Sequence, residues 1–167
     1  MNSAENRLIS CMPIGRIRTP HTHADQTPIQ PAFATGAPGR AEIEPAFEAG
    51  LRDLEGFSHV WLIYWFHEAG PARLVVQPYL QDVEHGVFAT RAPCRPNPIG
   101  LSLVRLVGRD GCVLHLEDVD MLDGTPLLDI KPYVPRFDSR TGVRTGWLAA
   151  VDEHTARVRG RWWAPPA

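Results

Sequence analysis

Prolines and glycines recur at short intervals along this chain, with 16 prolines and 14 glycines in 167 residues. Proline lacks the amide hydrogen that a central strand needs and glycine favours turns, so both keep regular elements short. Most of the segments between them are apolar or alternate between apolar and polar residues, which is the pattern of strands. The sequence therefore predicts an all-β fold: a small closed β-barrel of short, mostly antiparallel strands with one short helix.

The longest apolar run, Val60 to Phe66, is rich in aromatic and β-branched residues and marks a core strand over residues 57–67. Asp110-Gly111 is predicted to be a hairpin turn. The one helix is expected over residues 45–54, with Pro45 in its first turn and Gly50 near its end. The other predicted strands are shorter and cover residues 12–18, 41–44, 73–76, 86–89, 101–107, 113–118, 127–130 and 154–163.

The length suits a single domain, residues 1–167. The formal net charge is −2, so any contact with nucleic acid has to come from a local group of basic residues. Cys11, Cys94 and Cys112 form no paired motif, which predicts reduced thiols in a cytoplasmic protein. The N-terminus lacks an apolar signal-peptide core, and no stretch is long enough to span a membrane.

Two arginines lie on a stiff loop that follows a predicted strand. In residues 86–100, Pro93, Pro96 and Pro98 restrict the backbone around Arg91 and Arg95. A loop of this kind loses little entropy when a ligand orders it, and guanidinium groups suit carboxylates and phosphates. We therefore expect a ligand site here. The alternative is a rigid connector whose arginines form surface ion pairs.

A second candidate region combines a turn with acidic residues. The Asp123-Gly-Thr-Pro126 turn separates two apolar segments, and Asp120 and Asp129 flank it. These carboxylates are expected to accept hydrogen bonds from a ligand, with a metal site as the weaker alternative. His67-Glu68 follows the core strand at a sheet end, as a ligand contact or as a strand cap.

Two further groups have structural explanations that compete with functional ones. His59 is expected to be a buried histidine with a hydrogen bond to the backbone. Arg157, Arg159 and Arg161 alternate along the last predicted strand, where they would share one face. That face would be either an RNA-binding stripe or a solvated edge.

Several motifs in one order resemble the YaeB/TrmO family. They are Ile14-Gly-x-Ile-Arg-Thr-Pro20, Phe57-Ser-His-Val-Trp61 with Phe66-His67, Gly86-Val-Phe-Ala-Thr-Arg91, Arg95-Pro-Asn-Pro-Ile-Gly-Leu-Ser102 and Asp123-Gly-Thr-Pro-x-x-Asp-Ile-Lys-Pro-Tyr133. The resemblance covers about residues 8–137 and leaves a C-terminal strand segment, 138–167. It implies a small β-barrel that binds S-adenosylmethionine and forms a homodimer. It also implies methylation of N6 of threonylcarbamoyladenosine at position 37, in the anticodon loop of tRNA.

The resemblance also assigns residues to the site. The cofactor is expected to contact Pro28, Gln30, Pro31, His67, Glu68, Arg91, Leu103, Asp120, Met121, Leu122, Asp123 and Gly124. The RNA phosphates or the threonyl carboxylate are expected to contact Arg91, Arg95, Asn97 and Lys131. Three candidates for the proton acceptor remain, namely His67, Asp129 and Tyr133. No metal is expected.

Two departures from the family pattern bear on the substrate. Ile29 stands where the family usually has arginine, and the chain ends soon after the family core. Three alternatives follow: a methyltransferase with another acceptor, a non-catalytic S-adenosylmethionine-binding module, and a metal hydrolase built on Asp120, Asp123 and Asp129. If the site spans two subunits, residues around Trp162 and Trp163 are expected to contribute to it.

Overall fold

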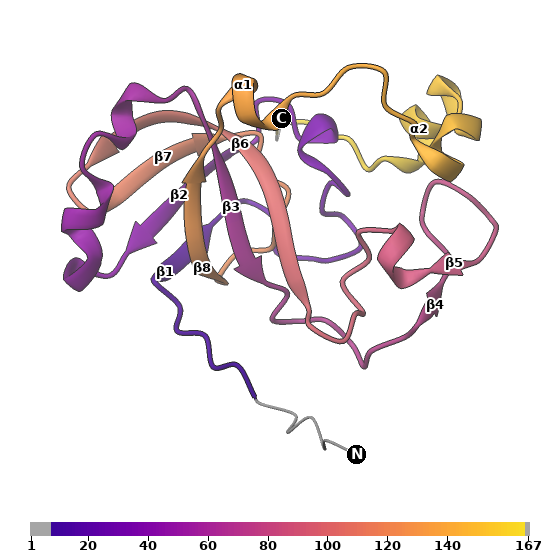
Figure 1. Cartoon of the computed structure of the whole chain (residues 1–167), viewed down its shortest axis with the longest axis horizontal. Helices are drawn as coiled ribbons and strands as arrows, with labels where there is room; N and C mark the ends of the chain where they lie inside the picture. The colour runs from indigo at the N-terminus through magenta and orange to yellow at the C-terminus, as the bar shows by residue number, and fades with distance from the viewer. Residues whose placement is uncertain (1–7, 166–167) are drawn as a thin grey trace, which may run out of the picture.

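The computed structural model describes residues 8–165, and its centre is a closed six-stranded barrel. The strands close in the order β1-β2-β7-β6-β3-β8, and every neighbouring pair is antiparallel (Figure 1). This confirms the predicted fold class. The barrel strands are β1 Gly15–Arg18, β2 Pro38–Ile43, β3 His59–Trp65, β6 Ile99–Asp110, β7 Val113–Glu117 and β8 Thr125–Pro132.

The alternation read from the sequence decides which side chains fill the barrel. In β3, Val60, Leu62 and Tyr64 are buried, while the residues between them are more exposed. Strand β6 follows the same period and pairs with β3 along one half and with β7 along the other. Apart from Tyr64, the core residues that the barrel strands bury are aliphatic, and all six strands contribute to them, including Ile17, Ala41, Ile43, Val104, Leu114, Leu116 and Leu127.

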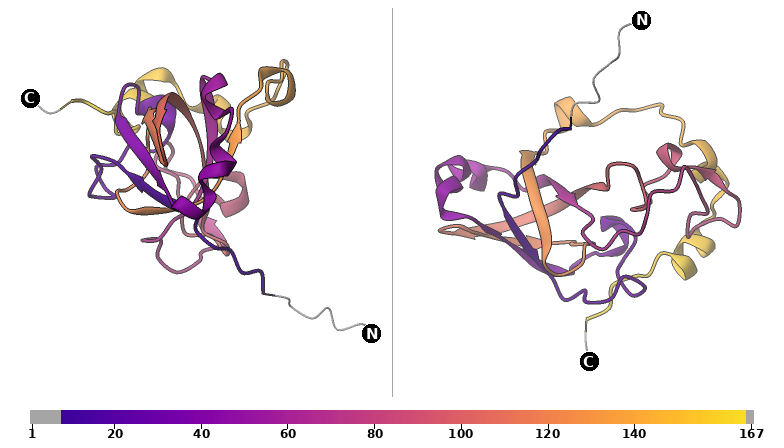
Figure 2. Two further views of the ribbon diagram at one scale, coloured as in Figure 1. Left: turned by 90° about the vertical axis from the view of Figure 1, so that its left-hand side faces the viewer. Right: turned by 90° about the horizontal axis from the view of Figure 1, so that it is seen from below.

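A second region lies beside the barrel. The short strands β4 (Val75–Val76) and β5 (His85–Gly86) form a ribbon, which the 3-10 helix η4 (Val87–Ala89) follows. After β8 the chain forms α1 (Pro135–Asp138), η5 (Gly146–Ala150) and α2 (Glu153–Arg159). This C-terminal segment runs along the outside of the β4–β5 region (Figures 1 and 2). It therefore covers loops far from it in the sequence.

Three predicted elements differ from the structure. The helix expected over residues 45–54 is a pair of 3-10 helices, η2 (Pro45–Leu51) and η3 (Leu54–Gly56), which are separated at Asp53, where the backbone is left-handed with φ of 67°. The strand expected over residues 86–89 is largely η4. The strand expected over residues 154–163 is wrong, since that segment contains helix α2.

Helix α2 begins at a side-chain cap that the alternating pattern concealed. The Asp152 carboxylate accepts a 2.6 Å hydrogen bond from the Thr155 amide, which satisfies a free donor of the first turn. The arginines 157, 159 and 161 therefore do not share a strand face. Arg159 pairs with Asp82 at 2.8 Å, and the Arg161 guanidinium lies 4.0 Å from the centre of the Tyr79 ring.

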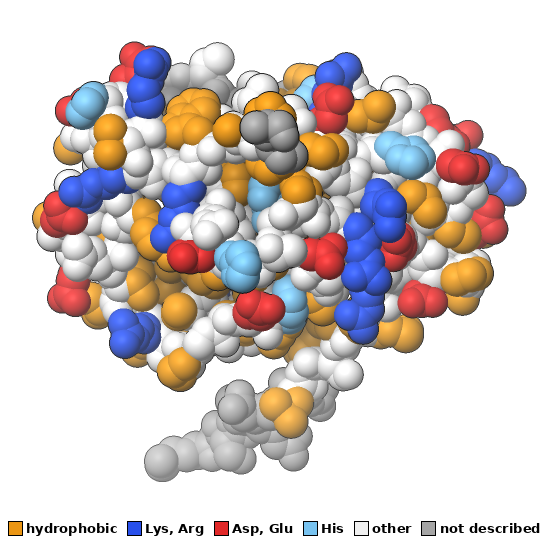
Figure 3. All heavy atoms as spheres, turned by 180° about the vertical axis from the view of Figure 1, so that it is seen from behind, with side chains coloured by type: hydrophobic (Ala, Val, Ile, Leu, Met, Phe, Trp, Pro, Cys, Tyr) orange, Lys and Arg blue, Asp and Glu red, His pale blue; other side chains and the backbone are white. Residues whose placement is uncertain are grey.

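No helix within residues 8–165 has the length and apolar character needed to cross a membrane. Figure 3 shows one face of the molecule, on which basic, acidic and apolar side chains are intermixed. This distribution agrees with the small net charge and offers no broad field of one sign on that face.

Candidate functional site

A hydrogen bond between two distant loops defines the candidate site. Arg91 Nη1 donates to Gln30 Oε1 at 2.6 Å, and Gln30 Nε2 donates to the Ile29 carbonyl at 2.6 Å. Pro28 is buried, and Pro31 begins the short helix η1 (Pro31–Phe33). The structure thus joins the 28–31 segment to Arg91, two regions that the family resemblance assigns to the cofactor site.

The turn at Asp120–Gly124 is held from the other side by the residues that follow β1. The Thr19 amide donates to Asp123 Oδ1 at 3.1 Å, and the Thr19 hydroxyl donates to the Met121 carbonyl at 2.9 Å. The amide of Asp123 donates to the His21 carbonyl at 2.8 Å. His21 Nε2 lies 2.8 Å from the Val119 carbonyl, and burial lowers the pKa of this imidazole. The turn is therefore a fixed feature of the barrel rim.

Asp120 takes part in a hydrogen-bonded group inside the barrel. Ser102 Oγ donates to Asp120 Oδ1 at 2.6 Å, and the Tyr64 hydroxyl lies 3.0 Å from Ser102 Oγ. Burial raises the pKa of Asp120 to about 7, although the Ser102 hydrogen bond and the charge of Arg91 both lower it. Burial and the charge of Asp120 raise the pKa of Tyr64 above its ordinary value. Arg91 thus acts electrostatically on both buried groups.

His67 and Glu68 lie beside the same turn. The Thr125 hydroxyl donates to the Leu122 carbonyl at 2.7 Å, which commits its hydrogen. At 3.4 Å, His67 Nδ1 must then be the donor to Thr125 Oγ1, so Nε2 carries the lone pair of the neutral ring. Nε2 lies 3.7 Å from the Glu68 carboxylate. This arrangement leaves His67 able to accept a proton at Nε2.

Arg95 supports the loop on which it lies. Its Nη1 donates to the Thr90 carbonyl at 3.0 Å and to the Ala92 carbonyl at 3.2 Å. The guanidinium also lies 5.9 Å from the centre of the Phe88 ring. Asn97, by contrast, is exposed on the outside of the loop. Arg95 Nη1 thus donates hydrogen bonds to loop carbonyls that have no backbone donor in a turn of this shape.

Because of these contacts, we expect Arg95→Ala to loosen the loop as well as to remove a positive charge. Cofactor affinity should fall about tenfold, since Arg91 is on the same loop, and the melting temperature should fall by several degrees. Calorimetric titration and thermal unfolding measure the two effects. Asn97→Ala, on the same loop, is the matched control and should change neither. If the cofactor affinity of Arg95→Ala is unchanged, Arg95 acts in RNA binding alone.

Four predicted site residues lie on the outer wall of the barrel, away from the buried acid. Lys131 Nζ pairs with Asp129 Oδ2 at 2.8 Å, and the Tyr133 ring packs edge-on against Trp61. The side chain of Leu103 points outward, because its neighbours Ser102 and Val104 are buried. Each of these residues has partners different from those of His67.

The three candidates for the proton acceptor are therefore separated within one chain. The Tyr133 amide donates to the His59 carbonyl at the start of β3, whereas His67 follows the end of β3. A seven-residue strand spans about 20 Å, so the side chains of Tyr133 and His67 cannot both reach the same substrate atom to take its proton. The expectation for His59 was also incorrect in detail, because its Nδ1 contacts the Ser58 hydroxyl at 2.9 Å and the ring is half-buried.

The three aspartates of the hydrolase alternative have separate partners. Asp120 bonds to Ser102, Asp123 to Thr19, and Asp129 to Lys131. Within the part of the chain that the structure describes, no group of three His, Cys, Asp or Glu residues is arranged to hold a metal ion.

Pattern analysis missed several residues at the site. Ser102 and Tyr64 occupy ordinary inward positions of predicted strands, and only a polar atom at a core position signals them. The C-terminal segment also reaches the loops. Trp147 Nε1 donates to the Ala89 carbonyl at 2.8 Å, and the Trp163 ring lies 5.4 Å from that of His21. Within one chain Trp163 thus packs against His21, and the expected contribution of Trp162 and Trp163 across a subunit boundary stays a prediction.

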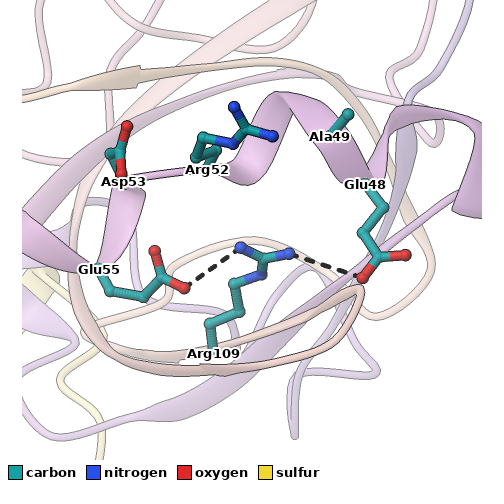
Figure 4. Close-up of a pocket in the computed structure, with 6 residues that line it drawn as sticks. All are labelled: Glu48, Ala49, Arg52, Asp53, Glu55 and Arg109. Atoms are coloured by element: carbon teal, nitrogen blue, oxygen red, sulfur yellow. Dashed lines mark hydrogen bonds and ion pairs between the residues drawn. The ribbon is translucent and has the colours of Figure 1, made fainter.

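A separate hollow lies on the opposite part of the barrel (Figure 4). Arg109 stands at its centre, 3.2 Å from Glu55 and 3.7 Å from Glu48, and its side chain is only 17% exposed. Its Nη1 also donates to the Leu51 carbonyl at 3.2 Å. These contacts fasten the 3-10 helices η2 and η3 to β6, so the hollow has a structural explanation.

Comparisons with known proteins identify the family of this chain. Residues 16–139 match the family model of the tRNA-methyltransferase O N-terminal domain. A probable S-adenosyl-L-methionine-binding protein of Pyrococcus abyssi is 56% identical over 141 residues, which cover 84% of this chain and 77% of the relative. The human tRNA (adenine(37)-N6)-methyltransferase is 38% identical over 138 residues, 78% of this chain and 31% of the human protein.

The fold comparison leads to the same family. The crystal structure of TrmO from Pseudomonas aeruginosa superposes with a TM-score of 0.71 at 43% identity and covers 84% of this chain and 63% of that one. This chain thus spans less than two thirds of the solved protein and less than a third of the human one. Since the family model matches more than half of the chain and the barrel is shared, the chain belongs to the tRNA-methyltransferase O family.

Proposed function

We propose that this protein is an S-adenosylmethionine-dependent methyltransferase that modifies N6 of threonylcarbamoyladenosine at position 37 of tRNA, in the cytoplasm. The observation that carries the proposal is the position of Arg91. It binds Gln30 at 2.6 Å, and its charge lowers the pKa of Asp120, so one guanidinium acts on both the 28–31 segment and the Asp120–Gly124 turn. Perturbed acids beside a cation are typical of functional sites.

The residues present fit the chemistry of S-adenosylmethionine. Bound there, the cofactor would supply a methyl group activated by its sulfonium charge. Arg91 would pair with the carboxylate of the cofactor, while Glu68 would offer negative charge to its ammonium group and Asp120 to its sulfonium. The backbone of the Asp120–Gly124 turn, fixed by Thr19 and His21, would orient it.

His67 is the proton acceptor that the geometry favours. Its Nδ1 is committed as a donor to Thr125, and its Nε2 lies beside Glu68, which would stabilise the imidazolium after proton transfer. Asp129 is paired with Lys131 on the outer wall. Asn97, Arg95 and Lys131 remain the proposed contacts of the RNA phosphates or the threonyl carboxylate.

A homodimer is part of the proposal. Trp65, Ile99 and Leu101 are 39%, 42% and 47% exposed on the outer face of β3 and β6, where Trp65 is directly opposite Ile99 and Leu101 lies two residues further along β6. Apolar side chains gathered in this way favour a covered surface, and a second copy of the chain is the proposed partner.

The test uses labelled S-adenosylmethionine and tRNA with or without threonylcarbamoyladenosine at position 37, followed by nucleoside mass spectrometry. Methylation of only the modified tRNA is expected. Methylation of another acceptor would keep the reaction and change the substrate. Binding without transfer to any RNA offered would favour a non-catalytic module. Light scattering of the same preparation should give twice the chain mass of 18.6 kDa, and a fully active monomer would contradict the dimer.

A further inference from the structure

A polar chain of three side chains crosses the otherwise aliphatic interior of the barrel. Tyr64 and Ser102 are 4% and 1% exposed, and Asp120 is 9% exposed. They sit among Val60, Leu62 and Val104. Burying polar and charged groups in such a core costs free energy unless they are hydrogen-bonded, and apolar residues of similar shape would serve stability as well. The retained carboxylate therefore needs another explanation.

When Asp120 is ionised, the hydroxyl hydrogens of Ser102 and Tyr64 have only one consistent arrangement. A carboxylate only accepts, so the Ser102 hydroxyl donates its single hydrogen to Asp120 Oδ1 at 2.6 Å. Ser102 Oγ can then only accept at its other contact, and the Tyr64 hydroxyl must donate to it at 3.0 Å. Two aligned hydroxyl dipoles thus point toward the carboxylate and stabilise its negative charge.

The barrel makes room for this arrangement at Gly100. Tyr64 and Gly100 are directly opposite in the β3–β6 pairing, and a Cβ on Gly100 would overlap the Tyr64 ring. The ring therefore lies across the glycine and brings its hydroxyl to Ser102, two residues further along β6. Since both strands belong to the closed barrel, the donors cannot move away from Asp120.

We propose that Tyr64 and Ser102 are positioning residues that orient the Asp120 carboxylate and stabilise its ionised form at the methyl-transfer site, so that the site binds cationic S-adenosylmethionine more tightly than neutral S-adenosylhomocysteine. The inference rests on the proposed function. Donor and product share their adenosine and amino-acid groups and differ by the methyl group and the charge on sulfur. A carboxylate in a region of low dielectric discriminates between them through that charge.

The discrimination depends on pH in a defined direction. With a pKa of about 7, Asp120 changes from largely neutral to largely ionised between pH 6 and pH 8. A cation binds the ionised form better, so affinity for S-adenosylmethionine rises with pH through this window. Affinity for S-adenosylhomocysteine has no such dependence on the Asp120 charge. The hydrogen bond from the Ser102 hydroxyl lowers the pKa of Asp120. Removing this hydroxyl therefore raises that pKa and moves the rise in S-adenosylmethionine affinity to higher pH.

Other titratable and charged groups surround Asp120 and have to be separated from it. Arg91 is a constant positive charge, and the raised pKa of Tyr64 keeps it neutral throughout. Burial lowers the pKa of His21, which favours its neutral form. Asp123 is paired with Arg18 at 3.6 Å. His67, at the Thr125 end of the turn, requires its own variant.

The experiment is calorimetric titration of the full chain with each ligand at pH 6, 7 and 8. The proteins are the wild type, Ser102→Ala, Tyr64→Phe, His67→Gln, and Ser58→Ala as the control at an exposed serine just before β3. For the wild type, we expect S-adenosylmethionine affinity to rise about tenfold from pH 6 to pH 8 and S-adenosylhomocysteine affinity to change less than twofold. At pH 7, Ser102→Ala and Tyr64→Phe should lose about tenfold and about threefold for the methylated ligand alone.

Several outcomes decide the matter. Persistence of the pH dependence in His67→Gln supports Asp120 as its source, and its loss there overturns the inference. Equal losses for both ligands in Ser102→Ala, with unchanged folding by circular dichroism, would make the polar chain purely structural. Equal wild-type affinities for both ligands at every pH overturn the inference but leave the proposed function intact. If the wild type binds neither ligand, both the proposed function and this inference are refuted.

Discussion

Asp120→Asn is expected to make the protein more stable at pH 8 and at the same time to weaken cofactor binding. An ordinary aspartate has a pKa of 3.8, whereas burial raises that of Asp120 to about 7. Between these values the folded state keeps a proton that the unfolded state releases, so this residue's contribution to stability falls as pH rises. Above pH 7 the full cost is present, roughly 4 kcal/mol from the difference in pKa.

Asparagine keeps the shape and an acceptor for Ser102 but carries no charge. The melting temperature of Asp120→Asn at pH 8 should therefore exceed that of the wild type by about 5 to 10 °C, while at pH 4 the two should be similar. The exposed Asp110→Asn is the matched control and should show no such trend. If Asp120→Asn is less stable than the wild type at pH 8, the surroundings of Asp120 stabilise its charge more than burial penalises it.

Gly15→Ala is expected to produce the largest loss of stability of any single methyl group added to the barrel. Gly15 is buried in β1 and pairs with Ile43 of β2 and Leu127 of β8. A Cβ there would overlap the backbone carbonyl of Glu42, which cannot rotate away as a side chain can. Relief requires β1 and β2 to separate at the place where the barrel closes. We expect a loss of about 3 kcal/mol or more.

Urea unfolding at equilibrium measures this loss. Gly50→Ala is the matched control, because Gly50 is exposed in η2 and a Cβ there would meet no atom within 4 Å. It should be neutral or slightly stabilising, since alanine restricts the unfolded chain. A loss below about 1 kcal/mol in Gly15→Ala would mean that the β1–β2 pairing adjusts more easily than its register implies.

The barrel was predictable because two-residue periodicity reports burial directly. The apolar run of β3, the alternation in β6 and the hairpin turn at Asp110-Gly111 identified core strands and their boundary. The same rule failed at residues 154–163, where alternating polarity reflects contacts of α2 with loops, and the Asp152 cap decided the helix. Periodicity describes a residue's neighbours only within a regular element that packs on the core.

The site was harder to predict, because its residues come from segments far apart in the sequence. Gln30 and Arg91 are 61 residues apart in the sequence, and no local sequence pattern predicts their hydrogen bond. Motif resemblance placed them together, and it also placed Leu103 and Tyr133 in the site, although both lie on the outer wall in a single chain. Ser102 was missed because a small polar residue in a strand is unremarkable until its partner is known.

The C-terminal segment has a consequence for how the protein reaches its active form. Strands β6 and β7 are joined by a tight hairpin and need little chain closure, whereas Arg161 bonds to the Ala24 carbonyl across 137 residues. Contacts of such separation carry a large loop-closure entropy and tend to form late. The barrel is therefore expected to fold before residues 147–163 dock, giving an interval in which the fold exists and the loops of the site are still unfastened.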